Sequence, residues 1–167
     1  PVYDIGHAAS KADRLDIELL NSVLAPARDG VWLLASSDDP EVDERVDASV
    51  ASTILGHLRG SFHHTVVDCE RQLNERTLAV LDAADRILLV TQLNVSALRS
   101  AQRSLQIFRR LGYPNGKLCV IVNRYQSGDV LSVADAEDLL KTEIYFRLPN
   151  DYKLMAGRRM VAANPTG

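Results

Sequence analysis

The sequence predicts an α/β fold, in which a mostly parallel sheet is covered by helices on both faces. Short runs of β-branched and aliphatic residues alternate along the chain with segments whose apolar residues recur every three or four positions. Such alternation is typical of strand–helix–strand crossovers. Of the 167 residues, 46% are hydrophobic and 25% charged. A chain of this length and composition can bury one core, so we expect a single domain over residues 1–167.

The first half of the chain predicts helices and strands in alternation. Leucines at helical spacing predict a helix over 13–24, and Asp29-Gly30 signals a turn before a buried-strand candidate at 31–35. A long helix is expected over 41–58, because apolar residues there are spaced four apart: Val42, Val46, Val50, Ile54 and Leu58. A β-branched run then predicts a strand over 64–68.

The second half continues the alternation. Ser96 is the expected N-cap of a helix that ends before Gly112 and Pro114, and Ser132 begins the last predicted helix. Helices are predicted over 74–84, 96–111 and 132–140. Strands are predicted over 86–91, 118–122 and 144–148. We expect all strands to run parallel in one sheet.

Composition excludes several classes of protein. The net charge of -3 gives no general attraction to nucleic acid or anionic lipid. The two cysteines, Cys69 and Cys119, are too few for a disulfide framework and indicate a reducing interior. No apolar run approaches the length that spans a bilayer, and no signal peptide is visible. Because the chain opens on Pro1 and not on Met, we expect a processed or truncated piece of a longer chain.

Asp68 is the most informative candidate residue, because it closes the predicted strand at 64–68. Ligands of open parallel sheets bind outside the carboxyl ends of the strands, and a carboxylate there can hold Mg²⁺ or its water beside phosphates. The usual partner of this Walker B carboxylate is a Gly-rich loop with a Lys, which the sequence does not contain. Half of a nucleotide site is thus predicted. An Asp in this position is also a common turn or capping residue.

Other motifs for chemistry are weaker. His57, His63 and His64 suggest a metal, but adjacent residues on a strand point to opposite faces, and no further ligand has a recognisable spacing. Ser36-Ser37 lacks the Gly-x-Ser-x-Gly elbow of a hydrolase.

Several motifs, taken in order, resemble the pilus-assembly ATPases called CpaE or TadZ, which are relatives of the MinD/ParA ATPases. They are VVDCERQLNERTLAVLDAADRILLV, SALRSAQRSLQIFRRLGYP, VIVNRY and LPNDYK, with weaker matches at ADRLDIELL and GVWLLASSDDPEV. The resemblance implies ATP and Mg²⁺ as cofactors. In this family Asp68 would be the Walker B carboxylate, Asn123 would hydrogen-bond the adenine edge, and Pro149, Asn150 and Asp151 would line the base pocket.

The departures from the family pattern are also informative. Asp68-Cys69-Glu70 stands where family members usually read Asp-Leu-Pro, and Leu93 and Val95 stand where Pro is common. The family's Walker A loop, with its strand and helix, would lie upstream of Pro1. Without that loop we expect weak ATP binding and no ATPase activity from this chain on its own. We also expect open sheet edges that favour aggregation or dimerisation.

The resemblance implies a role in assembly or polar localisation of a Tad-type pilus secretion machine, in the cytoplasm, at the cell pole or at the inner face of the membrane. Expected partners are pilus assembly proteins and a second copy of the chain. One alternative is an active ATPase whose Walker A segment lies outside this chain. The other is a ParA-like DNA-partitioning protein, for which a basic surface is relevant: Arg99, Arg103, Arg109, Arg110, Arg158 and Arg159. Solvated helix faces also carry arginines routinely.

Overall fold

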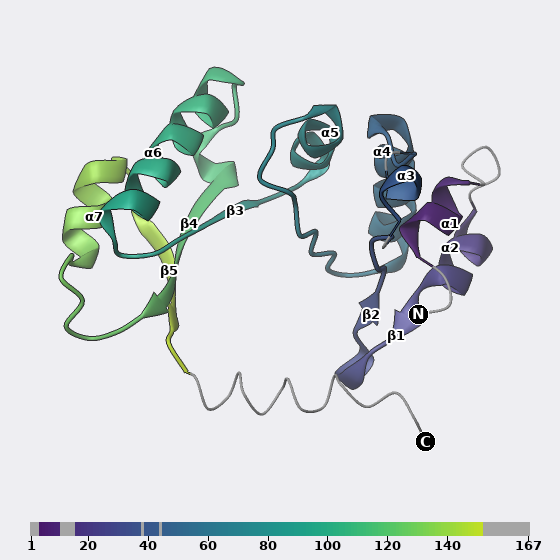
Figure 1. The fold of residues 1–167 in the computed structure, drawn as a ribbon, viewed down its shortest axis with the longest axis horizontal. Helices are drawn as coiled ribbons and strands as arrows, with labels where there is room; N and C mark the ends of the chain where they lie inside the picture. Colours follow the sequence, from purple (N-terminus) through teal and green to yellow (C-terminus); the bar gives the residue numbers. More distant parts are fainter. Residues whose placement is uncertain (1–3, 11–15, 38, 44, 152–167) are drawn as a thin grey trace. The chain divides into compact units, whose positions relative to one another are not determined.

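The computed structural model describes residues 4–10, 16–37, 39–43 and 45–151. By its internal contacts the chain divides into two compact units, residues 1–84 and residues 85–167. Each unit is described by itself below, with the elements labelled as in Figure 1. Among the described residues, no helix combines the length and the apolar character needed to cross a bilayer.

The first unit is mainly helical. Its helices are α1 (Ile5–Ala9), α2 (Ile17–Val23), α3 (Pro40–Asp43), α4 (Ala48–Ser61) and α5 (Glu75–Ala83). Leu20 and Val23 of α2 pack with Ile54 and Leu58 of α4, and all four side chains are buried. These residues belong to the apolar faces predicted from helical spacing, so the core of this unit follows from that pattern.

A short hairpin follows α2. Strand β1 (Ala25–Pro26) pairs antiparallel with β2 (Trp32–Leu33) around the 3₁₀ turn η2 (Arg28–Gly30). The turn uses positive φ angles at Asp29 (59°) and Gly30 (76°), a conformation for which an Asp-Gly pair is suited. The turn prediction is confirmed. The buried parallel strand predicted over 31–35 is wrong, because β2 is antiparallel and Trp32 is 49% exposed.

The long helix predicted over 41–58 is also wrong in extent, because the structure has two helices there, α3 and α4. The Asp47 side chain accepts a hydrogen bond from the Val50 backbone N–H at 2.8 Å and acts as the N-cap of α4. An Asp side chain can hydrogen-bond nearby backbone N–H groups, which offers the chain an alternative to continued helix. The apolar residues spaced four apart therefore extend over two helices and the break between them.

The strand predicted over 64–68 does not form. This segment is extended but belongs to neither sheet, and Val66 is 88% exposed. A β-strand is stabilised by backbone hydrogen bonds to a neighbour, and no described segment pairs with this one. β-Branched residues alone are therefore insufficient to form a strand. The prediction that one sheet contains every strand is wrong.

The second unit carries the parallel sheet that the sequence predicts. Its strands are β3 (Ile87–Thr91), β4 (Leu118–Tyr125) and β5 (Ile144–Pro149), all parallel and in the order β3-β4-β5. Helix α6 (Val95–Arg110) and the turn η3 (Asn115–Lys117) connect β3 to β4, and α7 (Val133–Leu140) connects β4 to β5. The predicted α/β fold class is confirmed.

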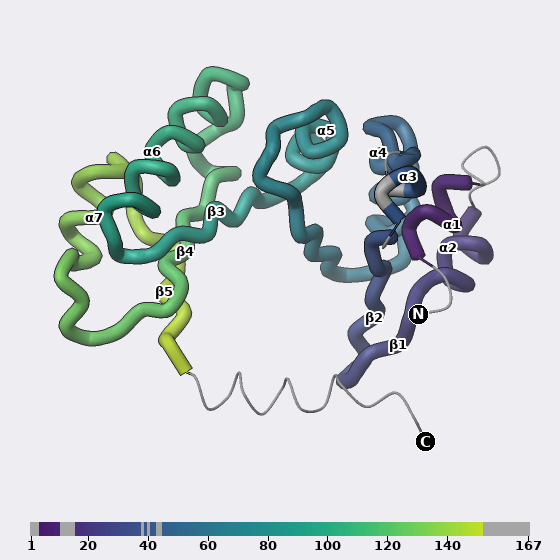
Figure 2. Tube along the Cα trace, viewed as in Figure 1, coloured from purple at the N-terminus to yellow at the C-terminus, as the bar shows by residue number. Residues whose placement is uncertain are grey.

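Helices α6 and α7 lie side by side against the sheet, as Figures 1 and 2 show. The Gln102 side-chain amide of α6 donates a hydrogen bond to the Leu139 backbone carbonyl of α7 at 2.9 Å. Buried apolar side chains fill the space between helices and sheet: Leu98, Leu105, Val120, Val122 and Leu140. Leu88 and Val90, which alternate with the buried Ile87 and Thr91 along β3, are exposed at 49% and 55%.

Candidate functional site

The carboxyl ends of β3, β4 and β5 lie at one edge of the sheet, because the three strands are parallel. This edge is where open α/β sheets bind their ligands. It carries Thr91 as the last residue of β3, Asn123 near the end of β4, and Pro149, which ends β5, with the residues that follow it. The second unit therefore brings four of the predicted site residues to one edge: Asn123, Pro149, Asn150 and Asp151.

Asn123 lies where β4 departs from regular geometry. Its side-chain Oδ1 accepts a hydrogen bond from the Arg124 backbone N–H at 2.9 Å, and Arg124 has a left-handed φ of 55°. The register with β5 shifts between Val122 and Tyr125. Bulges of this kind re-aim side chains and occur often beside binding sites. Asn123 is half-buried.

The end of β5 is tied to the end of β4. Pro149 pairs with Tyr125 in the ladder, and the Asn150 backbone N–H donates to the Tyr125 carbonyl at 3.0 Å. The Arg147 guanidinium lies 5.4 Å from the centroid of the Tyr125 ring, a cation–π distance. These contacts hold Asn123 and Asn150 on adjacent strand ends. Asp151 follows as an exposed residue.

Thr91 is a candidate that the sequence pattern did not single out. It is 5% exposed, and its Oγ1 is buried with no hydrogen-bond partner among the described residues. A buried polar atom without a partner is rare in folded proteins and marks a place for a water or a ligand group. The available signal was a hydroxyl at the carboxyl end of a predicted buried strand.

Asp68 belongs to the first unit and lies in the extended segment after α4, where it is exposed. Because that segment is not a strand, the prediction that Asp68 closes a strand of the parallel sheet is wrong. No group of three or more His, Cys, Asp or Glu side chains could hold a metal ion within the part of the chain that the structure describes. That part includes His57, His63 and His64.

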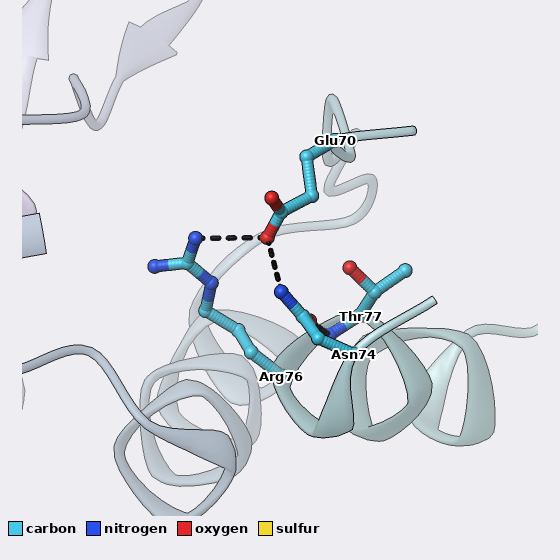
Figure 3. A network of polar contacts seen from close by, with 4 residues as sticks. All are labelled: Glu70, Asn74, Arg76 and Thr77. Carbon is cyan, nitrogen blue, oxygen red and sulfur yellow. Dashed lines mark hydrogen bonds and ion pairs between the residues drawn. The ribbon is translucent and has the colours of Figure 1, made fainter. Parts of the chain in front are cut away.

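The segment just after Asp68 is fixed by a polar network, shown in Figure 3. Glu70 Oε1 accepts hydrogen bonds from Arg76 Nη2 at 2.9 Å and from Asn74 Nδ2 at 2.7 Å. Asn74 Oδ1 in turn accepts from the Thr77 backbone N–H at 2.9 Å and caps α5. The Arg76 and Asn74 hydrogen bonds lower the pKa of Glu70 below its usual value. Glu70, one of the departures from the family pattern, thus has a structural role here.

Cys69 lies between two carboxylates. Its side chain is exposed, but neighbouring atoms displace part of its water, and this desolvation raises the pKa of the thiol. The negative charges of Asp68 and Glu70 raise it further. The thiol is therefore a poor nucleophile near neutral pH, which argues against covalent catalysis at this position.

The residues present do not fit all parts of a nucleotide equally well. The ends of β4 and β5 present amide and carbonyl groups that suit the hydrogen-bonding edge of a purine. The phosphates need a cradle of backbone N–H groups and a Lys, and the sequence contains no Gly-rich loop of that kind. The residues present fit the base of a nucleotide better than its phosphates. Arg158 and Arg159 lie outside the described residues.

No family model matches the chain. Its sequence is similar to the septum site-determining protein MinD of Synechocystis sp., with 26% identity over 117 residues that cover 67% of this chain and 43% of that protein. MinD of Thermotoga maritima is 23% identical over 112 residues, which cover 64% of this chain and 41% of that protein. The chain spans less than half the length of these relatives.

Solved structures with the same fold include a ParA family ATPase from Chlorobium tepidum, at a TM-score of 0.85 and 20% identity over 99% of this chain and 70% of that chain. MinD complexed with Mg-ADP from Pyrococcus horikoshii has a TM-score of 0.70 and 19% identity, covering 90% and 60%. The MinC:MinD complex of Aquifex aeolicus has a TM-score of 0.72 and 25% identity, covering 92% and 61%. The chain therefore has the fold of the MinD/ParA-like P-loop ATPases, and its relatives by sequence are MinD proteins.

Proposed function

We propose that the chain acts in the assembly or polar localisation of a Tad-type pilus secretion machine, as a protein of the CpaE/TadZ kind. Two observations support this role within the broader MinD/ParA-like class. The quoted motifs stand in the CpaE/TadZ order from Thr65 to Lys153, and the chain has the corresponding fold. The location proposed is the cytoplasm, at the cell pole or at the inner face of the membrane.

The proposed ligand is ATP with Mg²⁺, held through its base by this chain. The observation that carries this proposal is the hydrogen bond from Asn150 to Tyr125, because it holds the ends of β4 and β5 together beside Asn123. Asn123 is proposed to bond the adenine edge, with Pro149, Asn150 and Asp151 around the base. Asp68, in the first unit, is proposed separately as a Mg²⁺ carboxylate, because the family resemblance implies that role. The Pyrococcus horikoshii MinD was solved with Mg-ADP, which supports a nucleotide with Mg²⁺ as the ligand.

The proposed partners are pilus assembly proteins and a second copy of the chain. The Aquifex aeolicus MinD, which shares the fold, was solved as a complex with MinC. By analogy, a MinD/ParA-like fold provides a surface on which other assembly proteins dock. The proposed partner is therefore a protein, but not MinC itself.

A cellular experiment separates the proposed role from its alternatives. The gene is deleted in its own host and restored as a fluorescent fusion, and pili, septum position and DNA segregation are scored in the same cells. We expect loss of surface pili, with septa and segregation normal and with the fusion concentrated at a pole. Misplaced septa with normal pili would favour a MinD-like role. Segregation defects with normal pili would favour a ParA-like role.

A further inference from the structure

Helix α6 carries a concentration of positive charge that its own unit does not neutralise. It contains four arginines and no acidic residue, in a chain whose net charge is -3. Arg109 donates a hydrogen bond to the Lys141 backbone carbonyl at 3.4 Å and is thus tied to the end of α7. The other three, Arg99, Arg103 and Arg110, are exposed and form no hydrogen bond or ion pair within the part of the chain described.

These three arginines share one face of the helix. At 100° per residue they fall within about 40° of one another, opposite the buried Leu98 and Leu105. They extend over about 16 Å of the helix at 1.5 Å per residue. We call this surface the arginine face of α6. It also includes Ile107 and Leu111, which lie one turn apart beside Arg103 and Arg110 and are 42% and 48% exposed.

Helix stability does not account for this arrangement. A positive charge near the C-terminus of a helix is favourable, which applies to Arg110. Arg99 lies in the first half, nearer the positive end of the helix dipole, where a positive charge is unfavourable. Arg99 and Arg103 are also four residues apart, and like charges at that spacing repel. The helix retains both charges although they weaken it.

We propose that the arginine face of α6 binds an acidic protein segment, with carboxylates for Arg99, Arg103 and Arg110 and an apolar side chain against Ile107 and Leu111. Arginines beside exposed aliphatic residues are typical of protein interfaces, and guanidinium groups pair with carboxylates in two-pronged hydrogen bonds. Charge complementarity fixes the chemistry of the partner. The inference rests on α6 alone and does not depend on the proposed pilus function.

Two other anionic surfaces suit α6 less well. Duplex DNA would gain little from Ile107 and Leu111, because its binding depends mainly on contacts between phosphates and positive charges. A membrane-surface helix inserts its apolar side into lipid, whereas the apolar side of α6 is buried against the sheet, with Leu98 1% and Leu105 1% exposed. An acidic protein segment uses both the charged and the aliphatic residues.

The test uses the full 167-residue chain and a labelled helical peptide. The peptide carries glutamates at the spacing of the three arginines and leucines beside them, and a matched peptide has glutamine in place of each glutamate. Fluorescence anisotropy is measured at about 50 mM and about 500 mM salt, because ionic contacts weaken with screening. We expect the glutamate peptide to bind more tightly than the glutamine peptide, with the difference lost at high salt.

Variants assign the binding to the arginine face. The triple variant Arg99→Gln, Arg103→Gln, Arg110→Gln should weaken binding by about tenfold or more, since it removes three charge-assisted contacts. Its matched control, Arg28→Gln, Arg45→Gln, Arg71→Gln, removes the same charge from exposed positions in the first unit and should change binding little. Ile107→Gln should weaken the binding of the peptide but not the binding of DNA or lipid vesicles. Circular dichroism establishes that each variant is folded.

Three results would overturn the proposal. The first is equal binding of the glutamate and glutamine peptides at low salt. The second is an equal loss of binding in the two triple variants, which would mean that only net charge matters. The third is tighter binding of a 20-base-pair DNA duplex, or of phosphatidylserine vesicles, through the same three arginines without any effect of Ile107→Gln. That result would reassign the face to nucleic acid or lipid.

Discussion

Glu70 and Arg76 form an ion pair of 2.9 Å that joins the segment after Asp68 to the first turn of α5. In the CpaE/TadZ family that the sequence resembles, a Pro is expected at the position of Glu70. A Pro restricts the backbone by its ring, whereas Glu70 is held by side-chain hydrogen bonds. The same stretch of chain is thus kept in place by an interaction that depends on ionisation.

The first prediction concerns the pH dependence of this ion pair. Hydrogen bonds from Arg76 and Asn74 lower the pKa of Glu70, so the folded state favours the ionised form. Its stabilising effect is present above the ordinary Glu pKa and is lost as the pH falls through the lowered pKa of the folded state. NMR titration of the Glu70 carboxyl carbon should give a midpoint below the ordinary value. Arg76→Gln should raise the midpoint and Arg71→Gln should not; a midpoint at the ordinary value in the unchanged chain would refute the contact.

The second prediction concerns the reactivity of Cys69. Desolvation, followed by the charges of Asp68 and Glu70, raises the pKa of its thiol, so alkylation by iodoacetamide should be slow near neutral pH and rise steeply in alkali. The measurement uses Cys119→Ala, in which Cys69 is the remaining cysteine. Adding Asp68→Asn should speed alkylation at neutral pH, because one repulsive charge is removed. An unchanged rate would mean that Asp68 lies farther from the thiol in solution.

The third prediction tests the buried hydroxyl of Thr91. Val has nearly the same shape and no polar atom, so Thr91→Val should raise the free energy of unfolding by about 1 kcal/mol, the lower end of the cost of an unpaired buried group. Thr91→Ser keeps the hydroxyl and loses a methyl group, and it should lower stability. Urea unfolding of both variants gives the comparison. Destabilisation by Thr91→Val would show that the hydroxyl has a partner in solution, such as an ordered water.

The fourth prediction separates two candidates for the N-cap of α6. Asn94 Oδ1 accepts a hydrogen bond from the Ala97 backbone N–H at 2.9 Å and caps α6, so the sequence-based prediction of Ser96 as the N-cap is wrong. Asn94→Ala should therefore lower the free energy of unfolding by about 1 kcal/mol. Ser96 lies inside the first turn, so Ser96→Ala should change the free energy of unfolding by less than about 0.5 kcal/mol. The reverse order in thermal unfolding would restore Ser96 as the cap.

The fifth prediction concerns nucleotide binding. The chain should bind ATP with Mg²⁺ more weakly than micromolar, because the sequence holds no phosphate loop. A Kd near 1 μM by calorimetry, about -8 kcal/mol, would reveal a phosphate site elsewhere in the chain. NMR shifts caused by ATP should cluster at the ends of β4 and β5.

Asn123 needs a substitution that separates base binding from backbone support. Asn123→Asp keeps an acceptor for the Arg124 N–H and removes the amide donor. It should abolish the ATP-induced shifts without lowering the free energy of unfolding. Asn115→Asp, at an exposed asparagine in η3, is the matched control and should leave the shifts unchanged.

The second unit could be predicted closely from the sequence, and the reason is local. Strand β3 has four apolar residues before Thr91, α6 has a complete apolar stripe, and Ser132 begins α7 with a capping box that includes Asp135. In α7 the apolar pattern and the cap agree, and in β3 and α6 the apolar pattern agrees with the element that forms. The fold class and the placement of Asn123 and Asn150 at strand ends follow from these features together.

The first unit could be predicted less well, because its features depend on partners distant in the chain. The run at 64–68 has strand propensity but no described neighbour to pair with, so it stays extended and exposed. Asp47 interrupts an otherwise continuous helical pattern by capping α4. The hydrogen bonds of Glu70 have no periodic signal in the sequence. Contacts between side chains of this kind are visible only in three dimensions.

The spatial order β3-β4-β5 is also the order of synthesis. A ribosome releases about 5–20 residues per second, so each new strand and its helix emerge over seconds, far longer than a helix takes to form. Strand β4 can dock on β3 before β5 exists, and β5 then adds at the growing edge. No strand has to insert between two that are already paired. The second unit is therefore suited to assembling stepwise during translation.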